Sequence, residues 1–193
     1  MRVVLRQGDG RRRVWRRRGE NRHGDIVVNR REAYGGGGQM FWGGISYDSR
    51  TDLVPVQGTL NGQKYRDDII TGHVIPYANR LPPADRRTFL LVDDNCQPHR
   101  ARLVNAHLQQ NGIARMDPWP AKSPDLNPVE NAWSVLKLKI NRRIEPTDTV
   151  RDITRYAIEE WRRIPQRYLQ RLVRSMRQRI EAVIANDGGH TYY

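Results

Sequence analysis

Residues 88–95 read Thr-Phe-Leu-Leu-Val-Asp-Asp-Asn, an apolar run that ends in two acids and an amide. A short apolar run with β-branched and aromatic members is typical of a fully buried strand. Asp93 and Asp94 therefore fall at the tip of the expected strand, where ligands bind in α/β sheets. This stretch predicts a strand with acidic residues of a ligand-binding site at its carboxyl end.

The sequence around this strand predicts strands first, alternating strands and helices in the middle, and helices at the end. Further strands are expected over 40–45, over 53–56 at a sheet edge because of Pro55, and over 113–116. Helices are expected over 61–81, from Pro98 to residue 110, from residue 127 onward, over 148–163 and over 165–184. This order indicates an α/β or α+β fold.

The length of 193 residues suits one domain with its own core. We expect a single domain over 1–193, with a basic β-hairpin region over 1–32 and C-terminal helices over 145–193. Cys96 is the single cysteine, which excludes an internal disulfide and argues against a cysteine-based zinc site. The sequence shows no signal peptide and no transmembrane segment, so a nuclear location is expected in a eukaryote and a cytoplasmic one otherwise.

The chain is strongly basic, with a formal net charge of +13 and a pI near 10.6. Basic charge at this level favours a polyanionic partner, with nucleic acid as the first expectation and a solubilising surface as the alternative. Residues 2–32 hold a dense run of arginine around the turn signal Gly8-Asp9-Gly10, which predicts a hairpin that contacts phosphates; an unstructured basic arm is the alternative. Its candidate DNA-binding residues are Arg11, Arg12, Arg13, Arg16, Arg17 and Arg18.

Asp94 and Glu130 form the candidate catalytic and metal-binding pair. Mg²⁺ prefers oxygen ligands, and two such ions about 4 Å apart activate the attacking oxygen and stabilise the leaving oxygen in phosphoryl transfer. Each acid also has a structural alternative. Asp94 suits a turn in which it bonds its own backbone, and the adjacent Asp93 can exchange roles with it. Glu130 follows Asn127 by three positions, as in a capping box, and His99 suits a contact at a helix start.

Two long motifs resemble those of the mariner superfamily of DNA transposases, in its Tc-one-like branch. Residues 94–101 resemble the family segment DNxxPHxA, and residues 119–133 resemble WPxxSPDLNPIExxW. Residues 35–44 and the C-terminal residues 172–193 are also similar to segments of that branch. The resemblance covers nearly the whole chain, with its motifs in the family's order.

The resemblance implies a ribonuclease-H-like mixed sheet flanked by helices. It also implies a D-D-E triad that binds Mg²⁺ or Mn²⁺, cuts transposon ends and joins them to target DNA. Asp94 matches the second Asp and Glu130 matches the Glu, while Asp125 is interpreted as an acid that organises its loop. The implied partner is double-stranded DNA, both transposon ends and target, bound by a dimer; no membrane partner is expected.

The sequence departs from the family at three places. The first Asp normally lies in a strand like FSDES just before the segment that matches Arg2 to Trp15, so that strand and the helix-turn-helix domain are expected to be missing. Glu130 follows Asp94 by 36 positions, one more than usual, with Pro118 as the apparent insertion. We therefore expect little or no strand transfer from this chain. A non-catalytic DNA-binding remnant is the alternative. A third interpretation is an unrelated RNA-binding domain, but this sequence lacks the aromatic residues on a sheet that are typical of the common RNA-binding modules.

Overall fold

The computed structural model describes residues 3–6, 38–121, 123–145, 148–189 and 191. The six arginines of the expected basic hairpin lie outside these residues. The strands are β1 (Val3–Arg6), β2 (Gly38–Trp42), β3 (Val54–Val56), β4 (Leu90–Leu91) and β5 (Ala114–Arg115). The helices are α1 (Gly62–Lys64), η1 (Tyr65–Val74), α2 (Ile75–Asn79), α3 (Pro83–Arg87), α4 (Arg102–Gln110), η2 (Pro124–Leu126), α5 (Val129–Asn141), α6 (Val150–Arg163), α7 (Gln166–Arg174) and α8 (Met176–Ala185).

Strands β1, β2 and β3 form an antiparallel sheet in that order, so the predicted edge position of β3 is confirmed among the described strands. Phe41 in β2 lies opposite Val3 on one side and Pro55 on the other. Side chains alternate between the faces of a strand. Phe41 therefore joins one hydrophobic cluster, whereas Met40 and Trp42 join another.

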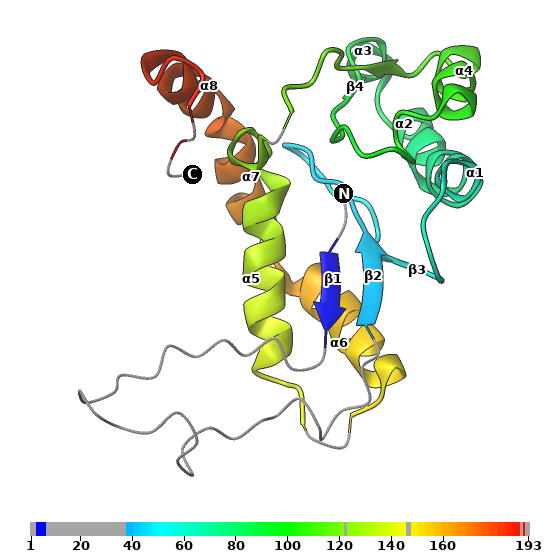
Figure 1. Ribbon diagram of the computed structural model, residues 1–193, viewed down its shortest axis with the longest axis vertical. Helices are drawn as coiled ribbons and strands as arrows, with labels where there is room; N and C mark the ends of the chain where they lie inside the picture. The colour runs from blue at the N-terminus through cyan, green and yellow to red at the C-terminus, as the bar shows by residue number, and fades with distance from the viewer. Residues whose placement is uncertain (1–2, 7–37, 122, 146–147, 190, 192–193) are drawn as a thin grey trace, which may run out of the picture.

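The cluster around Phe41 is built by the C-terminal helices. Helices α5 and α6 pack against each other, and α6 contacts β2. Trp133 and Trp161 stack in its centre with ring centroids 5.0 Å apart, and the Trp161 indole N–H donates to the Thr51 carbonyl at 2.8 Å. The second cluster lies on the other side of the sheet, where α1, η1, α2 and α4 gather (Figure 1).

The predicted helix over 61–81 is confirmed as three consecutive helical segments, α1, η1 and α2. Four of its residues are buried, namely Tyr65, Ile69, Ile70 and Val74. Its middle, Tyr65–Val74, winds as a π-helix, which periodicity at 3.6 residues does not anticipate. The wider turn still presents its apolar side chains to the core beside α4, where Val104 and Leu108 are buried.

Strands β4 and β5 form a separate parallel pair, with Leu90 opposite Ala114. The strand expected before Asp93 is therefore present, but the prediction that it is fully buried is wrong: Leu90 is 43% and Val92 is 40% exposed. Within the described part of the chain, β4 pairs with β5 alone. Among the described residues no strand pairs with its other edge, and nothing covers the Leu90 and Val92 side chains fully.

Two predicted helix boundaries are wrong. The helix expected from Pro98 begins at Arg102 instead, because residues 96–100 form turns in which the His99 and Arg100 amides both donate to the Cys96 carbonyl. The helix expected over 165–184 divides at Ser175 into α7 and α8. No described helix has the length and apolar character that a membrane crossing requires.

Candidate metal-binding active site

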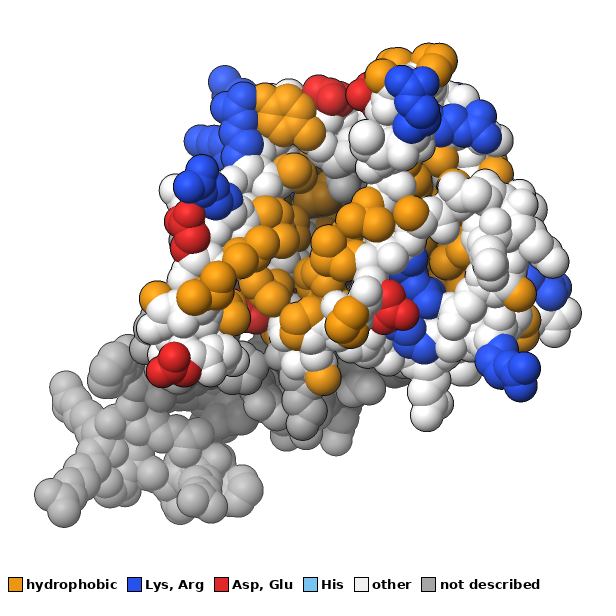
Figure 2. Space-filling view, turned by 90° about the horizontal axis from the view of Figure 1, so that it is seen from above, with side chains coloured by type: hydrophobic (Ala, Val, Ile, Leu, Met, Phe, Trp, Pro, Cys, Tyr) orange, Lys and Arg blue, Asp and Glu red, His pale blue; other side chains and the backbone are white. Residues whose placement is uncertain are grey.

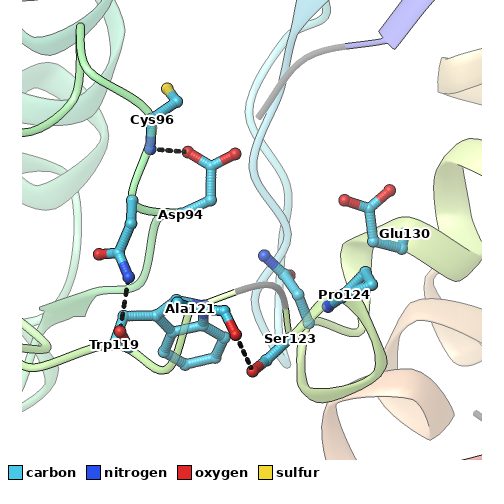
Figure 3. Close-up of a pocket in the computed structure, with 9 residues that line it drawn as sticks. Asp94, Cys96, Trp119, Ala121, Ser123, Pro124 and Glu130 are labelled. Carbon is cyan, nitrogen blue, oxygen red and sulfur yellow. Dashed lines mark hydrogen bonds between the residues drawn. The ribbon is translucent and has the colours of Figure 1, made fainter. Parts of the chain in front are cut away.

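Asp94 and Glu130 lie on opposite sides of one open pocket, and their carboxylates face the space between them (Figure 3). Asp94 follows β4, and Glu130 lies in the first turn of α5. The structure thus brings together two acids that are 36 positions apart. The remaining lining residues are Asn95, Cys96, Trp119, Ala121, Ser123, Pro124 and Asn127.

Asp94 is held by the loop that follows it. The Cys96 amide donates to Asp94 Oδ1 at 3.1 Å, and His99 Nδ1 lies 2.7 Å from the same oxygen. These contacts, that of His99 first, hold the pKa of the Asp94 carboxyl far below its ordinary value, so the group is ionised. The turn expected as the structural alternative is present, but it uses one oxygen. Among the described residues no group bonds Oδ2, so this oxygen is available to a cation.

Glu130 lacks the contact that a capping box requires. Residue Pro128 occupies the N-cap position of α5 without a side-chain bond, and Asn127 Oδ1 accepts from the Val129 amide at 3.3 Å. No group in the described part of the chain hydrogen-bonds the Glu130 carboxylate. Its pKa is raised by burial and by the negative charge of Asp94. A half-buried carboxylate without a partner, beside a second carboxylate, is a group that a cation would stabilise.

Asp93 is not among the residues that line the pocket, whereas Asp94 is. Asp93 is 4% exposed. The Tyr65 hydroxyl donates to Asp93 Oδ2 at 3.1 Å, and Arg100 and Arg115 each approach its carboxylate to 3.8 Å. Burial raises the pKa of Asp93, while His99 and Arg115 oppose that rise. Asp93 therefore anchors the loop from inside, next to the acid that faces the pocket.

His99 does more than contact a helix start. It is 1% exposed, its ring centroid lies 4.1 Å from that of Tyr65, and it reaches Asp94 through Nδ1. Asp94, Cys96 and His99 offer potential metal-ligand atoms within 4.8 Å of one another. Burial, reinforced by Asp94, raises the pKa of the Cys96 thiol to about 11. Because the thiolate is the form that binds metal, this set does not favour a soft metal ion.

Asp125 organises the loop that precedes Glu130. Its Oδ2 accepts from both the amide and the hydroxyl of Thr191, each at 2.9 Å. Its backbone carbonyl accepts from Arg179 of α8, which also donates to Asn131 Oδ1 at 2.7 Å. The Arg179 side chain is 2% exposed. Sequence reasoning missed Arg179, because one more arginine in a basic helix carries no signal of burial.

The donor set fits a hard divalent cation. Asp94 Oδ2 and both Glu130 oxygens have no competing bond among the described residues, and the Asn95 and Asn127 side chains line the same pocket. Carboxylate and amide oxygens are the ligands that Mg²⁺ and Mn²⁺ prefer. The Asn95 side-chain amide donates to the Trp119 carbonyl at 2.6 Å, which holds two of the lining residues together. Trp119 itself lines the pocket.

The sequence has relatives among transposases. It is 29% identical to the transposable element Tc3 transposase of Caenorhabditis elegans over 96% of this chain and 54% of that protein. It is 31% identical to the Tcb1 transposase of Caenorhabditis briggsae over 83% of this chain and 56% of that protein. The chain thus spans about half the length of the curated relatives it matches.

Similar folds occur in solved structures of Mos1 mariner transposase. The catalytic domain of Mos1 matches with a TM-score of 0.66 and 18% identity over 80% of this chain and 76% of that chain. A Mos1 paired-end complex with Mn matches with a TM-score of 0.72 and 17% identity over 98% of this chain and 55% of that chain. The predicted ribonuclease-H-like fold, with a helical C-terminal end, is confirmed by this likeness.

The family is given by a match that covers most of the chain. Residues 3–151 match the sequence profile described as DDE superfamily endonuclease. This range includes Asp94, Glu130 and every strand of the described structure. The chain therefore belongs to the DDE superfamily of endonucleases and is homologous to the Tc1/mariner transposases.

Proposed function

We propose that this chain is a catalytic domain for metal-dependent DNA cleavage and strand transfer in cut-and-paste transposition. The single observation that carries the proposal is the pocket in which Asp94 and Glu130 face each other with oxygens that no described group bonds. The DDE family and the transposase relatives support the same activity.

Asp94 and Glu130 would hold the divalent ions, with Mg²⁺ or Mn²⁺ as the expected metal. Bound ions supply the charge that activates the attacking oxygen and stabilises the leaving oxygen. The side chains around them set the position of these carboxylates. His99 and the Cys96 amide keep Asp94 ionised and oriented, while Glu130 lies at the start of α5, where the helix dipole favours a negative charge.

Double-stranded DNA is the proposed partner, both as transposon ends and as target. The net charge of +13 suits a phosphate backbone. Mos1 structures of similar fold include paired-end complexes, one with Mn and one with Mg, which supports a dimer on DNA and either metal. Arg11, Arg12, Arg13, Arg16, Arg17 and Arg18 remain proposed phosphate contacts.

Nicking of supercoiled plasmid DNA in Mn²⁺ tests the proposal. Asp94→Asn and Glu130→Gln should each abolish nicking and leave DNA binding near that of the parent chain. Asp117→Asn is the matched control, because this neighbouring acid is 68% exposed and lies outside the pocket lining. Nicking that survives both pocket substitutions would place the activity elsewhere. DNA binding without any nicking would agree with the little or no activity expected of this chain. Mn²⁺ binding that both pocket substitutions weaken would then support the proposed function, and Mn²⁺ binding that neither changes would favour the alternative, a non-catalytic DNA-binding remnant.

A further inference from the structure

Helix α7 presents an exposed basic face that the candidate site does not use. Arg167, Arg171 and Arg174 follow one another at intervals of four and three residues, so they share one side of the helix. All three are exposed, whereas Leu169 on the opposite side is fully buried. The sequence Gln166–Arg174 contains no acid. We call these three arginines the α7 ridge.

Carboxylates accompany the arginines of the neighbouring helix but not those of the α7 ridge. In α6, Arg155 pairs with Asp152 and Glu159. Arg162 pairs with Asp52, and Arg163 with Glu160. Among the described residues, Arg167 and Arg171 have no carboxylate partner. Three arginines of α6 are thus paired with carboxylates, whereas Arg167 and Arg171 of α7 are not.

Contacts with neighbouring side chains fix the ridge in place. Arg174 lies over the Tyr47 ring at 5.0 Å and donates to its hydroxyl, and the Gln166 amide donates to the Tyr47 carbonyl at 2.9 Å. Arg171 lies 5.9 Å from the Tyr168 ring. These contacts restrain Arg174 most and Arg171 less before any partner binds, which lowers the entropy that they lose on binding.

Like charges at this spacing destabilise an isolated helix, so the ridge is unfavourable without a partner of opposite charge. From Arg167 to Arg174 a helix rises roughly 10 Å at 1.5 Å per residue. A DNA duplex presents about six phosphate charges over that length, at one per ~1.7 Å. We propose that the α7 ridge binds the phosphate backbone of duplex DNA beside the pocket.

The position of the ridge supports this inference, which rests on the proposed function. Helix α7 packs against α5, which carries Glu130, and leads through Ser175 into α8 (Figure 1). Helix α8 contacts the η2 turn that adjoins the pocket. Viewed from above, Lys and Arg side chains lie around the rim of the molecule, with hydrophobic side chains toward the centre (Figure 2). DNA held on α7 would therefore lie on a helix that packs against α5, which carries Glu130.

The salt dependence of binding to a random-sequence DNA duplex tests the proposal, measured by fluorescence anisotropy on the full chain. The Arg167→Gln/Arg171→Gln variant should lower the slope of log K against log[salt] by about two, at roughly 0.9 per lost phosphate contact. The control Arg155→Gln/Arg162→Gln removes the same charge from arginines that are 55% and 70% exposed and already paired. Its slope should stay close to that of the parent chain.

Equal slopes for the two variants would overturn the proposal. The same holds if Arg167→Gln/Arg171→Gln weakens binding to single-stranded RNA, measured in parallel, and leaves binding to duplex DNA unchanged. Failure of the ridge is distinguishable from failure of the proposed function. If the parent chain binds duplex DNA and loses nicking in Asp94→Asn, the proposed function stands whatever the slopes show. If the parent chain does not bind duplex DNA, both proposals fall.

Discussion

Arg179 of α8 donates a hydrogen bond to the backbone carbonyl of Asp125, in the turn that leads to Glu130. The same guanidinium donates to Ser175 Oγ at 2.8 Å and to Asn131 Oδ1 at 2.7 Å. One buried side chain thereby joins α8 to the loop before Glu130 and to the residue after it. The planar guanidinium spreads its donors in a fixed fork that matches these three separated acceptors, whereas a lysine ammonium is a compact group on a flexible stem.

We predict that Arg179→Lys lowers both stability and Mn²⁺-dependent nicking. Leaving buried acceptors without a donor costs about 1–3 kcal/mol, and the loop before Glu130 loses its anchor. Urea unfolding and the nicking assay measure the two effects. The control Arg177→Lys changes an arginine that is 88% exposed and should leave both near the parent values. Parent-like nicking by Arg179→Lys would contradict the proposed link to the site.

Gly43 tests the packing of the two stacked indoles. A Cβ at this position would lie 3.0 Å from Trp133 Cη2 and 3.3 Å from Trp161 Cζ2. We expect Gly43→Ala to destabilise the fold by about 1–3 kcal/mol, because overpacking forces these rings to shift. At Gly44 the nearest atom would be 3.5 Å away, so Gly44→Ala should stay within about 0.5 kcal/mol. Equal urea midpoints for Gly43→Ala and Gly44→Ala would show that the two indole rings can shift at little cost in stability.

Glu160 predicts a dependence of stability on pH. It is 5% exposed and lies 2.8 Å from Arg163, 2.9 Å from Arg143 and 3.5 Å from Lys139. Burial opposes ionisation, but the arginines and the lysine prevail and hold the pKa of Glu160 below its ordinary value. A depressed folded-state pKa contributes stability that is present above the unfolded value, about 4.3, and is lost as the pH falls through the folded pKa.

Urea unfolding over a series of pH values checks this expectation. Glu160→Gln should be less stable than the parent chain at neutral pH, and the difference should shrink on acidification below about pH 4.3. Glu181→Gln removes one partner of an exposed ion pair and should cost little at any pH. A deficit for Glu160→Gln that stays constant down to strongly acidic pH would exclude the ionised carboxylate as its cause.

His99→Phe tests how Asp94 is positioned. The substituted ring can keep the stack on Tyr65 but loses the nitrogen that lies 2.7 Å from Asp94 Oδ1. We expect the Mn²⁺ concentration needed for half-maximal nicking to rise at least several-fold, with a thermal midpoint close to that of the parent. His107→Phe, on exposed helix surface beside Thr71, serves as the control. An unchanged Mn²⁺ requirement would leave His99 a packing role alone.

The acid pair and the helix that carries Glu130 could be predicted from the sequence. An apolar run precedes Asp94, a Pro-rich segment precedes Glu130, and both acids lie in motifs that resemble those of the transposase family. The inward turn of His99 does not follow. It depends on Tyr65, which is distant in sequence, and on Asp93, whose contact with Tyr65 no local sequence pattern indicates. Likewise, local periodicity predicts a buried strand at 88–92, whereas burial depends on which strands pair with it.

The most direct test of the account is a Mn²⁺ titration of the full chain, followed by electron paramagnetic resonance of the free ion. The account predicts binding that Asp94→Asn and Glu130→Gln each weaken at least several-fold and that Asp117→Asn leaves unchanged. Since a metal ligand must be ionised, binding should also weaken on acidification, because the pKa of Glu130 lies above its ordinary value. Equal Mn²⁺ binding by the parent and both pocket variants would contradict the claim that these two acids form the metal site.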